Sequence, residues 1–128
     1  MNLDVDFGLP FVSVIVQFRG QNLKLEKVLL DTGSARTIFK ADVVGEIGVV
    51  PEAGDAVDSI QGVGGIEYVY TKTFDWIQFD SLCLEHFQVE IGSMDYGIDI
   101  DGILGFDYIR AAGLMIDSVK LQVYSLAD

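Results

Sequence analysis

One aspartate of the chain stands where a carboxyl group could do acid–base chemistry. Asp31 directly follows the apolar run Val28-Leu29-Leu30, where a predicted strand leaves the core, and it precedes Thr32 and Gly33. A carboxyl group held rigidly in such a place can take up or release a proton during a reaction. Gly33 allows a main-chain N–H to approach the carboxylate, and the Thr32 hydroxyl can bond to backbone and lock the loop. An ordinary strand-to-loop turn uses the same residue types and stays open as the alternative.

The residues after this tripeptide extend the loop, and a distant segment resembles it in pattern. Ser34 can donate a hydroxyl hydrogen bond to the outer oxygen of the acid, and Ala35 continues the loop. An apolar pair leads into a glycine turn at Leu29-Leu30-Asp31-Thr32-Gly33 and again at Ile103-Leu104-Gly105. Two related halves of a β domain would produce this similarity.

A glycine-rich segment, Gly62-Val63-Gly64-Gly65, lies between two predicted strands, 56–61 and 66–73. It does not fit the G-x-G-x-x-G pattern of dinucleotide-binding loops, because Glu67 occupies the last glycine position and no helix is predicted to follow. Its backbone could bind an extended peptide as an added strand. A plain hairpin turn is the simpler alternative.

Together these segments resemble the retropepsin-like aspartic proteases, the single-domain relatives of pepsin, over nearly the whole chain. Residues 28–35, 62–65 and 101–107 carry the resemblance in that order. In that family the first segment holds the catalytic acid and the second is the flap over the substrate. The third, with Ile103, Leu104 and Gly105, threads beside the active-site loop and supports it. This third segment is more similar to those of cellular and bacterial members than to those of viral members.

The resemblance implies catalysis by two aspartates, and the chain has a single Asp-Thr-Gly. The other Asp-Ser pairs, at Asp58, Asp80 and Asp117, lack the following glycine. The second acid should therefore be Asp31 of another copy, in a homodimer with the site on its two-fold axis. Two close carboxylates share one proton, so one can deprotonate a water while the other polarises the peptide carbonyl. No metal or cofactor is then required, and activity should be bell-shaped in pH and favour the acidic side.

The hydrophobic pattern has a period of two over most of the chain, which predicts β-strands. The predicted strands cover residues 11–18, 23–30, 56–61, 66–73, 74–79, 82–91, 114–116 and 120–124. Helical turns are predicted at 40–47, stopped by Gly48, and a short helix at 106–112, stopped by Gly113. With the resemblance, the expected fold is an all-β, retropepsin-like closed barrel or β-sandwich. It has one short C-terminal helix, spans residues 1–128 as a single domain and is active as a two-fold dimer.

Composition excludes several classes of partner. Acidic residues number 20 and basic residues 8, for a net charge of −12, which disfavours binding to nucleic acid or to an anionic membrane surface. Half of the residues are hydrophobic, which is high for 128 residues and suggests apolar surface buried against a partner. The N-terminus lacks the features of a signal peptide, and no apolar stretch approaches the ~20 residues of a membrane span. The expected location is the cytoplasm.

Other residues that could do chemistry are weaker candidates. Cys83 and His86 could suggest a thiol protease pair, but three positions apart on a strand places them on opposite faces. A buried thiol and a surface imidazole are the expectation. A set of acidic residues and a set of aromatic residues remain, namely Asp95, Asp99 and Asp101, and Tyr68, Tyr70 and Trp76. The acidic set departs from the EF-hand pattern and predicts a solvated loop, with no metal. The aromatic set predicts strand packing, with Tyr68 or Tyr70 as the candidates for a substrate subsite.

The leading hypothesis is thus an aspartic endopeptidase that cuts extended peptide segments with Asp31 from each of two subunits. Two alternatives stay open. One is a dimeric domain of the same fold that binds peptides without cutting them. The other is a protease domain of a longer chain, regulated by segments outside this sequence.

Overall fold

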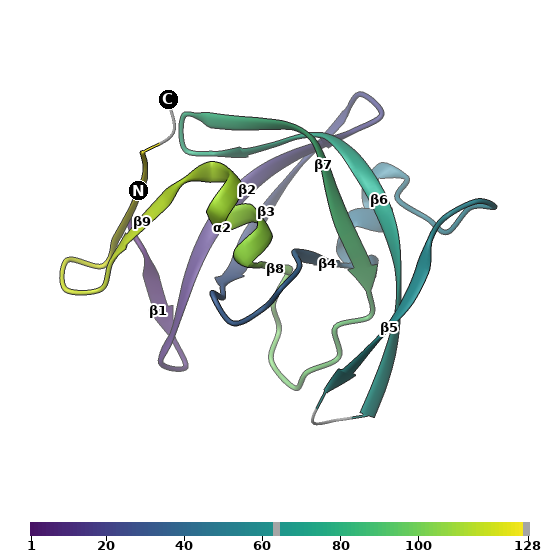
Figure 1. The fold of residues 1–128 in the computed structure, drawn as a ribbon, viewed down its shortest axis with the longest axis horizontal. Coiled ribbons are helices and arrows are strands. Elements are labelled where there is room, and N and C mark those ends of the chain that lie inside the picture. The colour runs from purple at the N-terminus through teal and green to yellow at the C-terminus, as the bar shows by residue number, and fades with distance from the viewer. Residues whose placement is uncertain (63–64, 127–128) are drawn as a thin grey trace.

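The computed structural model describes residues 1–62 and 65–126, and strands make up most of this part of the chain (Figure 1). The elements are β1 (Asp4–Asp6), β2 (Leu9–Phe18), β3 (Gln21–Leu30), β4 (Ile38–Lys40), α1 (Ala41–Val44), the 3-10 turn η1 (Gly45–Ile47), β5 (Val57–Gly62), β6 (Gly65–Phe79), β7 (Leu82–Gly92), β8 (Gly102–Leu104), α2 (Phe106–Ala112), β9 (Leu114–Asp117) and β10 (Gln122–Ser125). The prediction of a mainly β fold with a short C-terminal helix is confirmed. None of the helices in the described residues has the length and apolar content needed to cross a bilayer.

The main sheet closes on itself. Its strand order is β1-β2-β3-β8-β4-β7-β6-β5, and β2 also pairs with β6, which completes a barrel. Most neighbours are antiparallel, but β3 pairs with β8 and β4 pairs with β7 in parallel. These parallel pairs bring residues far apart in the sequence to the same edge of the barrel. The β5–β6 hairpin extends from one end of the molecule, away from β9 (Figure 1).

The hairpin of β2 and β3 is longer than predicted because its turn is tighter. Arg19 and Gly20 both have positive φ, 48° and 83°, and Phe18 pairs directly with Gln21. Such two-residue turns match the twist of the flanking strands, so pairing continues up to the turn. Strand β6 likewise runs unbroken from Gly65 to Phe79, where the sequence predicted two segments, because β5 pairs with it up to Tyr70 and β7 pairs with it from Tyr70 onward.

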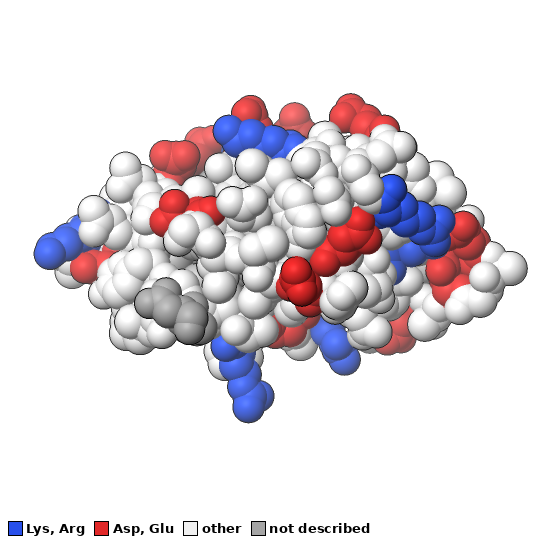
Figure 2. Space-filling model, turned by 90° about the horizontal axis from the view of Figure 1, so that it is seen from above, with Lys and Arg blue, Asp and Glu red and all other residues white. Residues whose placement is uncertain are grey.

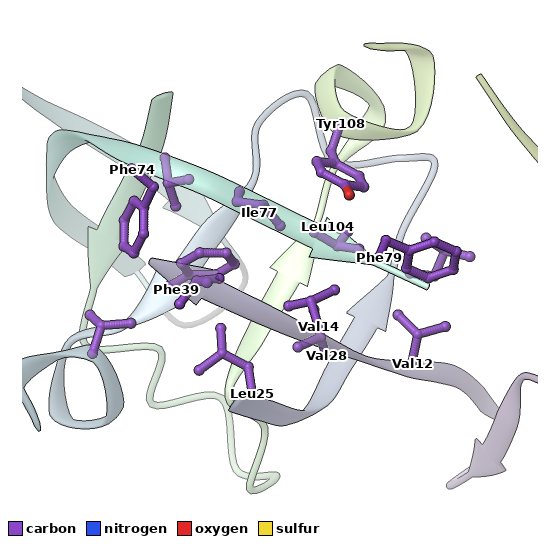
Figure 3. Packing of buried hydrophobic residues seen from close by; sticks show 14 of the residues in the cluster. Val12, Val14, Leu25, Val28, Phe39, Phe74, Ile77, Phe79, Leu104 and Tyr108 are labelled. Atoms are coloured by element: carbon purple, nitrogen blue, oxygen red, sulfur yellow. The ribbon is translucent and has the colours of Figure 1, made fainter. Parts of the chain in front are cut away.

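The barrel interior is filled by alternate residues of the strands (Figure 3). Val12, Val14, Val16 and Phe18 of β2 are all buried, as the period-two pattern predicts. The run Val28-Leu29-Leu30 is apolar on both faces, since Val28 and Leu30 join this interior and Leu29 packs against a second, smaller cluster. Strand β3 is therefore firmly anchored just before Asp31.

The two predicted helical segments end at glycines, as expected. Gly48 and Gly113 have φ of 84° and 60°, the left-handed conformation that terminates helices without strain at glycine.

The N-terminus pairs with the C-terminal hairpin of the same chain. The Met1 ammonium group donates to Val123 O at 2.8 Å, and Leu3 N donates to Leu121 O at 2.8 Å.

One lysine is buried in the barrel wall. Lys72 on β6 is 4% exposed, and its Nζ lies 2.6 Å from Glu52 Oε1 and 2.9 Å from Asp55 Oδ2. Arg19 also contacts Glu52, with both of its terminal nitrogens. The hydrogen bonds from Arg19 and Lys72 lower the pKa of Glu52 from its usual 4.5 to about 2. This charged cluster ties the loop before β5 to the β2–β3 turn and to β6.

Candidate active site

Asp31 follows the last residue of β3, and the neighbouring strand holds its main chain in place. Leu30 pairs with Leu104 of β8, and Asp31 N donates to Leu104 O at 3.0 Å. The Ile103-Leu104-Gly105 segment therefore lies directly beside the Asp31 loop, although more than 70 residues separate them in sequence. The Asp31 side chain is half-buried at this edge of the barrel.

The backbone of the loop holds the Asp31 carboxylate. Gly33 N donates to Asp31 Oδ1 at 2.9 Å, and Ser34 N donates to Asp31 O at 3.2 Å. A Cβ atom on residue 33 would lie 3.3 Å from the same Oδ1, tighter than most such contacts. The expectation that glycine lets an N–H reach the acid is confirmed by this geometry. A charge-assisted hydrogen bond of this kind fixes one carboxylate oxygen.

Ser34 does not make the hydrogen bond expected from the sequence. Its hydroxyl donates to Arg36 O at 2.8 Å rather than to the acid, because the chain turns back between these two residues. Ser34 O in turn accepts from Phe106 N at 2.6 Å. Thr32 and Ala35 are exposed on the loop. Ser34 thus shapes the loop and joins it to α2.

The hydroxyl that locks the loop belongs to Thr37, which the sequence analysis did not single out. Thr37 is fully buried; its Oγ1 donates to Asp107 Oδ1 at 2.8 Å and accepts from Gly105 N at 3.1 Å. Thr37 N donates to Asp107 Oδ2 at 3.1 Å, and Tyr108 N donates to Asp107 Oδ1 at 2.7 Å. The only hint in the sequence was a threonine that opens the apolar run Ile38-Phe39.

Gly105 has to be glycine for reasons of space. A Cβ there would collide with the backbone carbonyl group of Arg36 and lie 2.9 Å from Ser34 O. Its φ of −83° is ordinary, so the requirement comes from close packing and not from backbone conformation. The Asp31 loop and the Gly105 turn are therefore packed backbone against backbone.

The glycine-rich segment begins at the last residue of β5 and ends at the first residue of β6. Gly62 pairs with Gly65, which has a φ of 117°, a conformation that favours glycine. Val63 and Gly64, which the sequence analysis also placed in the flap, lie outside the described residues. Both strands of the hairpin are described up to these two residues.

Glu67 links this hairpin to the loop after β7. Its Oε1 accepts from Met94 N at 2.8 Å, and its Oε2 accepts from the Tyr96 hydroxyl at 2.7 Å. Burial and this hydrogen bond raise the pKa of Tyr96 well above its usual range. The sequence analysis used Glu67 only to reject a dinucleotide site, because nothing local indicates a partner 29 residues away.

The thiol and imidazole candidates do not form a site. Cys83 and His86 are both exposed on β7, so the expectation of a buried thiol was wrong. Cys83 lies near the end of the β6–β7 hairpin, where it pairs with Gln78 and turns outward. Partial burial and the nearby Glu85 raise the pKa of its thiol, which disfavours the thiolate needed in a nucleophile.

The acidic loop after β7 has structural contacts. Asp101 Oδ2 accepts from Glu26 N and Lys27 N, each at 3.1 Å, so this carboxylate ties the loop to β3. Asp99 lies 3.6 Å from the Lys40 ammonium group. Of the aromatic candidates, Tyr68 is 72% exposed on the hairpin, and Tyr70 packs against the barrel core.

Comparisons with known proteins identify the family and the fold. The profile of a family described as aspartyl protease matches residues 14–108, so the chain belongs to that family. Among solved structures, a retropepsin-like aspartic protease from Rickettsia conorii aligns with a TM-score of 0.70 at 13% identity, over 97% of each chain. At this identity the likeness shows the fold, which is retropepsin-like. No curated protein sequence matched the chain.

Proposed function

We propose that this protein is an aspartic endopeptidase whose active form is a homodimer with two Asp31 carboxylates at its two-fold axis. The observation that carries the proposal is the held carboxylate: Asp31 follows β3 directly, and Gly33 N donates to its Oδ1 at 2.9 Å. Membership of the aspartyl protease family supports the same chemistry. Because the chain holds a single Asp-Thr-Gly, a second subunit is needed for the second acid.

In this mechanism the two acids share one proton. The ionised carboxylate takes a proton from a water molecule as the water oxygen attacks the peptide carbonyl carbon. The protonated carboxyl group donates a hydrogen bond to the carbonyl oxygen, which carries the developing negative charge. Collapse of the tetrahedral intermediate breaks the C–N bond and passes a proton to the leaving amine. All of these steps use carboxyl groups and water.

Apolar surface near the chain ends supports association of two copies. Several large apolar side chains of β1, the β9–β10 hairpin and their flanks are exposed, namely Val5, Phe7, Met115, Val119, Leu121, Tyr124 and Leu126. Exposed apolar groups gathered at one end of a small domain are typical of an interface. Two copies at −12 each carry −24, so dimerisation should strengthen as acid or salt reduces their repulsion.

The hairpin of β5 and β6 supports a role as a flap. It projects from one end of the molecule, and the hydrogen bonds of Glu67 to residues 94 and 96 hold its second strand against the neighbouring loop (Figure 1). In the proposed enzyme, Gly62-Val63-Gly64-Gly65 closes over the substrate and binds its backbone as an added strand. Closure would also exclude water from the reaction.

The test is cleavage of a mixed peptide library by the wild type and by Asp31→Asn, from pH 3 to 7, at several protein concentrations. Asparagine keeps the shape of the side chain and the oxygen that accepts from Gly33 N, so the fold should be retained. We expect cleavage that peaks on the acidic side, rises faster than linearly with concentration and disappears in the variant.

Mixing the two proteins tests the shared site. If subunits exchange freely in an equal mixture of wild type and Asp31→Asn, about one quarter of the dimers carry two intact acids. If each subunit worked alone, about one half of the subunits would be active. Activity near one quarter of that of wild type at the same total concentration supports the composite site. Activity near one half, or cleavage that survives Asp31→Asn, contradicts the proposal. Peptide binding with no cleavage under any condition would favour a binding domain.

A further inference from the structure

A cavity of about 580 Å³ lies beside the candidate active site. Its walls come from four places: Arg36 and Thr37, which follow the Asp31 loop; the segment from Ala56 to Ile60, mostly in β5; Thr71 of β6; and residues 88–90 of β7. The cavity therefore lies between the continuation of the acid loop and the first strand of the proposed flap. Its place between these two segments makes it a candidate pocket for a side chain of a peptide held under that flap.

The charges that line the cavity are unequal. Glu90 and Asp58 contribute two carboxylates, and Arg36 contributes one guanidinium group. Glu90 is half-buried in the wall, whereas Arg36 and Asp58 are both exposed and can remain solvated. Within residues 1–62 and 65–126, these three side chains take part in no ion pair. With two carboxylates and one guanidinium group, the lining carries a net charge of −1 when all three groups are ionised.

The surroundings of Glu90 disfavour its ionised form in the absence of a cation. Burial raises the pKa of the Glu90 carboxyl above its usual value, Arg36 opposes the shift, and Asp58 and Asp107 add to it. A carboxylate in such a place is stabilised by a cation that reaches it out of water. The backbone holds Glu90 in position, because its N–H donates to Thr37 O at 3.0 Å.

The apolar part of the lining suits a long aliphatic stem. Ile60, which is half-buried, and Val57, which is exposed, belong to the lining, so methylene groups could pack there while a terminal cation reaches the carboxylates. The chain also carries a net charge of −12, and acidic groups are spread across the face seen in Figure 2. This field raises the local concentration of cationic peptides.

We propose that this cavity is the pocket for a lysine or arginine side chain of the substrate, with Glu90 as the residue that determines the preference. The inference rests on the proposed endopeptidase function and specifies its substrate class: peptides with a basic residue near the cleaved bond. Arg36, outnumbered by carboxylates, would not make an acidic side chain the better occupant.

The experiment measures kcat/KM for matched fluorogenic peptides that carry lysine, norleucine or glutamate at each position around the cleaved bond in turn. At one position we expect lysine to exceed norleucine by about tenfold, the discrimination that one charge-assisted hydrogen bond provides. Glu90→Gln should reduce this ratio to about threefold or less, mainly through KM, and Glu90→Lys should shift the preference toward glutamate.

Glu85→Gln is the matched control. It removes the same charge from an exposed position on the same strand, outside the cavity, and should leave the ratio unchanged. The inference is overturned if no position prefers lysine, if glutamate is preferred, or if Glu90→Gln keeps the full ratio.

Binding separates this inference from the proposed function. The Asp31→Asn protein cannot cleave in the proposed mechanism, so Kd values for the lysine and norleucine peptides test the pocket alone. Tighter binding of lysine that Glu90→Gln abolishes supports the pocket even if wild type cleaves nothing. Cleavage without such a preference keeps the protease and refutes the pocket.

Discussion

Thr37→Val removes the hydroxyl that joins the Asp31 loop to the Gly105 turn and keeps the shape of the side chain. The buried N–H of Gly105 then loses the acceptor that lies 3.1 Å away, which costs about 1–3 kcal/mol. Asp107 Oδ1 loses a donor at 2.8 Å but keeps Tyr108 N, which adds about 1 kcal/mol. The expected loss of unfolding free energy is about 3 kcal/mol, or a Tm lower by about 10 °C for a domain of this size.

Thr37→Ser is the control that separates the hydroxyl from the rest of the side chain. Serine keeps both hydrogen bonds and loses one buried methyl group, for a cost of about 1 kcal/mol. Urea unfolding can be followed by the fluorescence of Trp76, the single tryptophan, at one fixed protein concentration, because the proposed dimerisation would make stability depend on concentration.

The same pair of variants tests the link to activity. Well below its Tm, Thr37→Val should lose at least about tenfold in kcat, because a small displacement of Asp31, the proposed catalytic group, is costly. Thr37→Ser should stay close to wild type. Equal stability of the two variants, within about 0.5 kcal/mol, would refute the role assigned to the hydroxyl.

Two further predictions concern packing and pH. Gly105→Ala should destabilise the protein by about 3 kcal/mol or more and reduce cleavage, because its Cβ meets backbone of Arg36 and Ser34 that cannot move aside; thermal unfolding and peptide cleavage check this. Glu52→Gln should unfold more easily in urea than wild type at pH 7, with a difference that shrinks between pH 4.5 and about 2. The folded-state pKa of Glu52 is lowered to about 2, so its stabilising contribution is present above 4.5 and lost as pH falls through that range. A difference that grows on acidification would contradict this assignment.

Local patterns were sufficient to predict the strands and turns. The alternation from Val12 to Phe18 predicts a strand with one buried face, and the glycines at 48 and 113 end helical segments because they adopt positive φ without strain. The contact between Gly33 N and the Asp31 carboxylate was also predictable, since it spans only two residues.

Contacts between distant segments were not predictable in detail. Ser34 was expected to support the acid, but the chain turns so that its hydroxyl meets Arg36 O, and the fully buried Thr37 locks the loop instead. Glu67 gave no local hint of its contact with Tyr96, and Cys83 faces outward where burial was expected. A hydroxyl or carboxylate has many possible partners, and its neighbours in sequence do not select among them.

The sequence by itself determined that a carboxylate follows a buried strand, that one N–H can hold it, and that the chain contains a single Asp-Thr-Gly. Only the tertiary structure decided which groups surround that carboxylate. The parallel pairing of β3 with β8 places Leu104 and Gly105 beside Asp31, and the pairing of β4 with β7 places Glu90 beside Thr37. The physical reason is the separation in sequence between the residues that interact. Strand periodicity and turn conformation arise from neighbouring residues, whereas the environment of a charge depends on which distant segments of backbone the closed barrel brings together.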